Sequence, residues 1–211
     1  MTAPRCVGVL LAGGAARRFS GMPKGLALVD GLRIADRALA ALRGATDRQI
    51  VVANDPRAAR WFPGLHVVRD AEEGLGPLHG LRTALASTGD APMLVVAWDM
   101  PFVTAALLAT LRAEGERGAT AVVPVAGDPP RSEPLCAYYG AGALATCDAL
   151  LAAGERRAAA LHESMSGTIL VREDVLATLG DPTRLLFSVD TLEDLAAMGG
   201  RLPDGEDTAR R

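Results

Sequence analysis

A glycine-rich segment followed by two basic residues is the first part of the sequence whose residue types suggest chemistry. Gly13 and Gly14 come directly after an apolar run, and Arg18 and Lys24 follow in the same segment. Glycines let the backbone bend and bring its N–H groups close to phosphate oxygens, and two cations offset the charge of a triphosphate. The spacing is neither that of a Walker A loop nor GxGxxG. We therefore predict a triphosphate-binding loop, with a tight glycine turn and two solvated basic side chains as the alternative.

A candidate metal ligand, Asp99, comes just after the apolar run Met93–Ala97. A carboxylate at the end of a buried strand is poorly solvated and favours a nearby cation. Mg²⁺ binds one or two carboxylates together with phosphate oxygens and water, which fits one aspartate beside a triphosphate. The alternative is that Asp99 caps a helix that begins after Pro101.

Polar residues and glycines follow two further apolar runs. Asn54 and Asp70 each come after such a run, and residue type alone makes both of them turn residues. Gly76 and Pro77 form a helix start signal, and Gly80 on the first turn would let a ligand approach the backbone closely. The alternative for this segment is a plain helix start.

The elements that must position these residues alternate between short apolar runs and longer amphipathic stretches. This alternation predicts a three-layer, doubly wound, mostly parallel sheet with helices on both faces. Ligands of such sheets bind outside the carboxyl ends of the strands, where the glycine loop lies. We expect strands at 6–11, 49–53, 66–69, 93–97 and 121–125, and helices at 36–43, 78–87 and 104–114.

The pattern changes after Pro129. We expect a single domain over residues 1–200 and a polar, disordered tail over residues 201–211. Within the second half we expect strands at 135–139, 168–172 and 185–189, and helices at 141–153, 156–165 and 192–198.

Composition limits the class of protein. The chain has 211 residues, of which 49% are hydrophobic and 22% charged, as in an ordinary globular protein. The formal charge of −3 gives no sequence-wide basic surface for nucleic acid. Cys6, Cys136 and Cys147 are widely spaced, so we expect reduced core thiols and no structural zinc. The N-terminal apolar run is too short for a signal peptide or a spanning helix, and we therefore expect a cytoplasmic protein with no membrane partner.

The glycine-rich segment also resembles a known signature. Its similarity is to the loop of nucleotidyltransferases that make activated sugars, activated isoprenoid precursors and dinucleotide forms of molybdopterin. Within that group the chain resembles the molybdenum cofactor guanylyltransferase family over about residues 7–198. Phe19, Ser20 and Pro23 stand where that family typically has Met, Gly and Asp. The segments that carry the resemblance are Leu11–Leu26, Gly76–Gly80, Trp98–Phe102, Gly154–Arg157 and Phe187–Leu195.

The resemblance implies a Rossmann-like nucleotidyltransferase fold and a Mg²⁺-dependent transfer of GMP from GTP to the phosphate of molybdopterin, with release of pyrophosphate. It implies catalytic roles for Arg18, Lys24 and Asp99, with Asp99 holding the metal. The implied nucleotide-binding residues are Leu11, Ala12, Gly13, Gly14, Lys24, Asn54, Asp70, Gly76, Pro77, Gly80 and Asp99.

The implied acceptor-binding residues are Arg156, Arg157 and Asp190. A solvated helix start is the alternative for the two arginines, and Ser188 and Asp190 replace two asparagines of the family pattern. The resemblance also implies transient contacts with molybdenum cofactor biosynthesis proteins and recipient molybdoenzymes. Three alternatives stay open: CTP as the donor, a sugar or isoprenoid phosphate as the acceptor, and a non-catalytic nucleotide-binding homologue.

Overall fold

A central sheet decides where every other element lies. The structure is a computed structural model, and it describes residues 6–13, 19, 22–69, 75–89 and 91–203. The strands lie in the order β10-β7-β9-β6-β1-β4-β5, and β8 pairs with β7 outside this path. Their bounds are β1 Val7–Leu11, β4 Arg48–Val52, β5 His66–Val68, β6 Met93–Ala97, β7 Ala121–Ala126, β8 Arg131–Ser132, β9 Cys136–Tyr139 and β10 Thr168–Val171.

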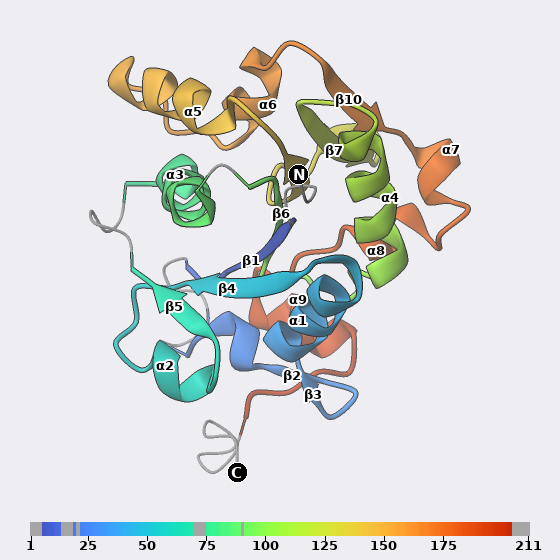
Figure 1. The fold of residues 1–211 in the computed structure, drawn as a ribbon. Coiled ribbons are helices and arrows are strands. Elements are labelled where there is room, and N and C mark those ends of the chain that lie inside the picture. Colours follow the sequence, from blue (N-terminus) through green and yellow to red (C-terminus); the bar gives the residue numbers. More distant parts are fainter. Residues whose placement is uncertain (1–5, 14–18, 20–21, 70–74, 90, 204–211) are drawn as a thin grey trace.

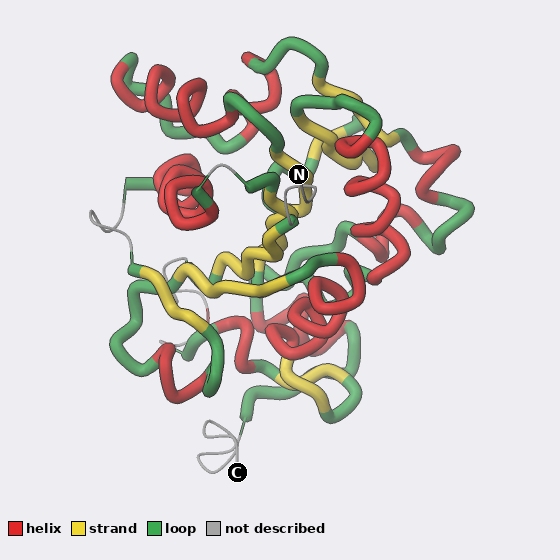
Figure 2. The backbone as a smooth tube through the Cα atoms, in the orientation of Figure 1, coloured by secondary structure: helices red, strands yellow, loops and turns green. Residues whose placement is uncertain are grey.

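Most neighbouring strands in this sheet are parallel. β1 is parallel to β4 and β6, whereas β9 runs antiparallel to both β6 and β7. Every residue of β1 and β6 is buried, because helices cover both faces, and this explains their unbroken apolar runs. The predicted three-layer, mostly parallel sheet is confirmed, and Figure 2 shows the strands as the middle layer between helices.

Two pairs of helices cover the two faces of the sheet (Figure 1). α1 (Ile34–Ala45) packs against α4 (Ala105–Glu116) on one face, and α3 (Pro77–Thr88) packs against α5 (Ala143–Ala152) on the other. The side chains of β1 alternate accordingly: Leu10 packs with α1 and α4, and Val9 packs with α3 and α5. Within the described part of the chain, no helix has both the length and the apolar composition that a bilayer span requires.

A smaller apolar cluster joins the segment after β1 to the C-terminal part of the chain. Phe19 and Val189 are fully buried in it. Its elements are the 3-10 helix η2 (Lys24–Leu26), the hairpin strands β2 (Leu28–Val29) and β3 (Leu32–Arg33), and α9 (Leu192–Ala197). Arg201 exchanges two backbone hydrogen bonds with Leu28, of 2.8 and 2.9 Å. The first residue of the expected tail therefore pairs with the hairpin, and residues 204–211 lie outside the described part.

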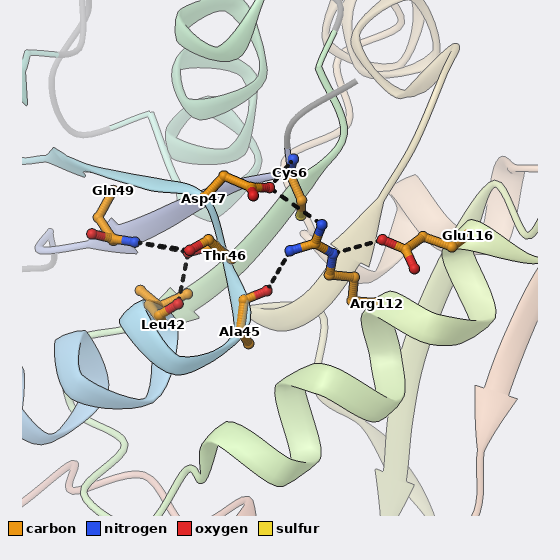
Figure 3. A network of polar contacts seen from close by, with 8 residues as sticks. All are labelled: Cys6, Leu42, Ala45, Thr46, Asp47, Gln49, Arg112 and Glu116. Atoms are coloured by element: carbon orange, nitrogen blue, oxygen red, sulfur yellow. Dashed lines mark hydrogen bonds and ion pairs between the residues drawn. The ribbon is translucent and has the colours of Figure 1, made fainter. Parts of the chain in front are cut away.

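A polar network fixes the edge of the sheet at which β1 begins (Figure 3). Arg112 on α4 donates to the carbonyl oxygen of Ala45 at 3.0 Å and pairs with Asp47 at 3.2 Å and Glu116 at 2.7 Å. Asp47 in turn accepts a hydrogen bond of 2.9 Å from the backbone N–H of Cys6. This network joins the end of α1, the start of β1 and α4, on the side opposite the carboxyl ends of the parallel strands.

The second half contains one wrong prediction. Residues 185–189 form no strand: Leu185 ends the short helix α8 (Pro182–Leu185), and an irregular segment follows. Asp181 caps α8 by accepting from the N–H groups of Thr183 and Arg184, with Pro182 in the first turn, and this start signal outweighs the apolar run. Leu185 and Val189 are buried because their side chains belong to two separate apolar clusters.

Other expectations hold with shifted boundaries. The helix expected at 156–165 is α6 (Ala159–Ser164), and two short helices, α2 (Ala58–Trp61) and α7 (Glu173–Leu176), were not expected.

Cys6, Cys136 and Cys147 are free and buried. Burial raises the pKa of the Cys6 thiol to about 11, as expected for an inert core thiol.

Candidate functional site

A cavity of about 520 Å³ lies at the carboxyl ends of β1, β4 and β6. It is the position at which a doubly wound sheet binds its ligands. Its lining comes from the ends of these strands, from the start of α3, from η2 and from the C-terminal segment. The lining residues are Leu11, Gly13, Lys24, Val52, Ala53, Asn54, Gly76, Pro77, Gly80, Ala97, Trp98, Asp99, Glu133, Leu135, Ser188 and Asp190.

Lys24 provides the positive charge of this cavity among the described residues that line it. It is also the only lysine in the sequence. Its Nζ lies 2.7 Å from Oδ1 of Asp190 and 3.4 Å from Oδ2 of Asp99, and its side chain is 15% exposed. The three residues come from distant parts of the chain, so the fold itself brings them together.

The backbone next to Lys24 is held by close packing against an aromatic ring. A Cβ atom added to Gly25 would lie 2.4 Å from a ring carbon of Trp98. The Trp98 ring is buried and stacks on Trp61, with ring centroids 6.2 Å apart. Only glycine permits this approach, and it sets η2 directly against the end of β6.

Asp99 is fixed at the centre of the cavity. Its carbonyl oxygen accepts a hydrogen bond of 2.9 Å from the backbone N–H of Val189. Burial raises the pKa of the Asp99 carboxyl, the nearby Lys24 ammonium opposes this, and the charge of Asp190 adds to it. Thr104, not Asp99, caps the helix that follows, because its side chain accepts from Leu107 N–H at 3.2 Å.

Asp190 is held at the cavity by the start of α9. Its backbone N–H donates to Oδ2 of Asp194 at 3.0 Å, and Thr191 and Asp194 form a capping box. The side chain of Asp190 is 59% exposed, so its contact with Lys24 forms the rim of the cavity.

Glu133 is a cavity residue that sequence reasoning missed. It lies just before β9, half-buried, and its Oε1 accepts a hydrogen bond of 3.1 Å from the N–H of Leu135. Burial raises the pKa of this carboxyl to about 7, the Leu135 N–H opposes the change, and the charges of Asp99 and Asp190 add to it. The available signal was an acidic residue next to a proline at the start of an apolar strand.

Further predicted nucleotide contacts line the same cavity, after β1 and β4 and at the start of α3. They include Gly13, Asn54, Pro77 and Gly80. Gly76 precedes α3 with a φ of 97°, a conformation that favours glycine.

Several predicted site residues are not brought into the cavity. Ala12 is buried and donates to Val52 O at 2.8 Å without lining the cavity. The side chains of Arg156 and Arg157 bond to the neighbouring Glu155 and lie outside it. The carbonyl oxygen of Arg156 accepts a hydrogen bond of 3.4 Å from the N–H of Leu78 in the first turn of α3. The predicted residues Gly14, Arg18 and Asp70 lie outside the described residues.

The oxygen atoms present fit a magnesium ion. Oδ1 of Asp99 is buried without a hydrogen-bond partner among the described residues, and Asp190 shares Lys24 with it. In the described ranges no three His, Cys, Asp or Glu residues are grouped to hold a metal by themselves. A cation here would need further oxygen ligands from a phosphate, and this is how Mg²⁺ usually binds.

Comparison with known proteins agrees with this geometry. The family model of the MobA-like NTP transferase domain matches residues 8–168. A "probable molybdenum cofactor guanylyltransferase" of Chloroflexus aggregans is 35% identical over 196 residues, covering 89% of this chain and 90% of the relative. A molybdenum cofactor guanylyltransferase of Shewanella frigidimarina is 35% identical over 156 residues, covering 74% and 79%.

A solved structure gives the same result. The crystal structure of molybdopterin-guanine dinucleotide biosynthesis protein A from Archaeoglobus fulgidus has a TM-score of 0.75 and 26% identity, over 91% of this chain and 96% of that one. With the cavity and its lysine and aspartates already described, the chain belongs to the MobA-like NTP transferase domain family and is a nucleotidyltransferase.

Proposed function

We propose that this nucleotidyltransferase transfers GMP from GTP to the phosphate of molybdopterin, in a Mg²⁺-dependent reaction that releases pyrophosphate. The observation that carries the proposal is the meeting of Lys24, Asp99 and Asp190 in one cavity. Relatives over most of the chain's length that are named molybdenum cofactor guanylyltransferase support the choice of donor and acceptor.

The chemistry is an in-line displacement at phosphorus. An oxygen of the acceptor phosphate forms a bond to the α-phosphorus of GTP, and the bond from that phosphorus to the bridging oxygen of the β-phosphate breaks. Pyrophosphate leaves with the electron pair. The nucleophile is already anionic, so no general base is needed, and catalysis consists of positioning and charge neutralisation.

The charged residues then have distinct tasks. The Lys24 ammonium contacts the phosphates once a triphosphate replaces its carboxylate partners, and Arg18 would add a second positive charge. Asp99 and Asp190 would hold Mg²⁺, which neutralises phosphate charge when it is bound. Asn54, Asp70 and the glycines around the start of α3 would contact the base and ribose.

The proposal is tested with purified protein, Mg²⁺, GTP and molybdopterin. We expect a molybdopterin–guanine dinucleotide by mass spectrometry and an equal amount of pyrophosphate. Parallel reactions replace GTP with CTP, or molybdopterin with a sugar phosphate. Stronger turnover in either parallel reaction would reassign the donor or the acceptor, and no pyrophosphate in any of them would make the protein a non-catalytic nucleotide binder.

A cytoplasmic location and transient contacts with cofactor biosynthesis proteins and recipient molybdoenzymes belong to the same proposal.

A further inference from the structure

Glu133 lines the cavity but has no role in the proposed transfer step. Because β9 is antiparallel to β6, with Cys136 opposite Val96, the start of β9 lies at the edge where β6 ends. In the sheet β9 lies on one side of β6, and β1 and β4 lie on the other. Glu133 and Asn54 therefore flank Asp99 from opposite sides. If the nucleotide lies over β1 and β4, Glu133 belongs to the half of the cavity left for the acceptor.

The backbone fixes the Glu133 carboxyl firmly. Its own N–H donates to Pro124 O at 2.9 Å, its carbonyl accepts from Cys136 N–H at 3.1 Å, and Oε1 accepts from Leu135 N–H. In the described part of the structure no donor contacts the second oxygen, Oε2. A well-positioned carboxylate thus keeps, with respect to the described residues, one acceptor atom available at the cavity.

The position is also unfavourable for a carboxylate. Burial and the charges of Asp99 and Asp190 raise the pKa of Glu133 to about 7, so its ionised form weakens the fold. Groups held in such environments cluster at functional sites. A purely structural role would be met as well by a neutral side chain.

We propose that Glu133 is a specificity-determining residue for the acceptor: Oε2 accepts a hydrogen bond from an N–H or O–H group of the phosphate-bearing acceptor. The inference rests on the proposed transfer to such an acceptor. Above its pKa of about 7 the Glu133 carboxylate is ionised and only accepts hydrogen bonds. It therefore favours phosphate-bearing substrates that place a hydrogen-bond donor there and disfavours those that place a hydrogen-bond acceptor there.

The test variant is Glu133→Gln, compared with the wild type at pH 8, above the pKa of about 7 of Glu133. The Leu135 N–H needs an oxygen partner, so the glutamine oxygen stays on Leu135 and its NH₂ group faces the cavity. The NH₂ group of the glutamine then faces the N–H or O–H group of the phosphate-bearing acceptor. Two hydrogen-bond donors cannot bond to each other. We expect the KM for the acceptor to rise about tenfold or more, and the KM for GTP to stay within about twofold.

The matched control is Glu173→Gln. Glu173 also accepts a backbone hydrogen bond, from Gly127 N–H at 2.8 Å, but it does not line the cavity. Neither KM is expected to change in this variant. Circular dichroism checks the fold of both proteins, and if Glu133→Gln fails to fold, Glu133→Ala is measured in its place with the same expected rise in the acceptor KM.

The outcomes separate this inference from the proposed function. A wild-type protein that transfers no nucleotide overturns the function and the inference together. An active wild type with an unchanged acceptor KM in Glu133→Gln overturns the inference alone. An equal rise in the KM for GTP also overturns it, because Glu133 would then act on the nucleotide.

Discussion

Lys24 lies between Asp190 and Asp99, and a triphosphate would compete for the same ammonium group. The carboxylates therefore hold the side chain in place before the substrate arrives. Such an arrangement limits the reorganisation needed when charge develops in the reaction. Glu133 and Asp99 have raised pKa values in the same cavity, so the ionised forms of both carboxyl groups are less favourable there than in water.

Replacing Lys24 by alanine should leave a folded but poorly active enzyme. We expect kcat/KM for nucleotide transfer to fall by a factor that corresponds to about 2.7–4 kcal/mol, by analogy with loss of one preorganised donor. Steady-state kinetics of pyrophosphate release measures this change. Near-normal turnover in a folded Lys24→Ala protein would remove Lys24 from the catalytic machinery.

The raised pKa of Glu133 predicts a pH-dependent stability difference. The folded protein holds this proton up to a pKa of about 7, above the ordinary value of 4.5, so stability is lost as the pH rises between these values. Glu133→Gln should be about 1–3 kcal/mol more stable than the wild type at pH 8, with little difference near pH 4.5. Denaturant unfolding in metal-free buffer measures the free energy of unfolding of the two proteins at each pH. An equal stability difference at the two pH values would contradict a raised pKa for Glu133.

At the scale of elements, η2 depends on one close contact between Gly25 and Trp98. The contact sets Lys24 against the end of β6. The sequence contained a signal for the hairpin of β2 and β3 that follows η2. Asp30-Gly31 adopts positive φ values of 50° and 77°, and an Asp-Gly pair is a known hairpin signal that was available for β2 and β3.

Gly25→Ala should disturb both stability and nucleotide binding. The added Cβ would meet the buried Trp98 ring, which stacks on Trp61 and has little room to move. We expect a loss of about 1–3 kcal/mol in unfolding free energy and a higher KM for GTP. The control for stability is Gly13→Ala, where no atom of the described residues lies within 4 Å of the added Cβ and the melting temperature should match the wild type. A Gly25→Ala protein that melts like the wild type would show that the contact is easily relaxed.

At the scale of the whole molecule, the fold brings together residues that are far apart in sequence. Lys24 and Asp190 are 166 positions apart. The strands β1 and β6 could be predicted because burial on both faces leaves unbroken apolar runs. The antiparallel direction of β9 leaves no signal in the sequence, so the acidic residue before Pro134 could be noticed but not assigned to the edge where β6 ends. The run Leu185–Val189 misled because its apolar residues are buried in two side-chain clusters without pairing as a strand in the sheet.

The two ends of the parallel strands have separate roles, and this separation can be tested. Arg112→Ala removes the contacts to Ala45, Asp47 and Glu116 at the end opposite the cavity. We expect a loss of about 1–2 kcal/mol in unfolding free energy with unchanged KM and kcat.

Arg117→Ala is the matched control for that change. Its pair with Glu114 is exposed and should contribute less than about 0.5 kcal/mol. Equal melting temperatures for the two variants would mean that the Arg112 network adds nothing to stability beyond an exposed ion pair.

Because Lys24 is the chain's only lysine, amine-selective acylation has one side-chain target. Apart from the terminal amine, every such modification falls inside the cavity and removes the charge that balances Asp99 and Asp190. We expect one acyl group on Lys24 to abolish transfer, and bound GTP to shield it, as followed by peptide mass spectrometry. A reagent or dye attached through this chemistry would label the cavity at Lys24 and no other side chain of the molecule.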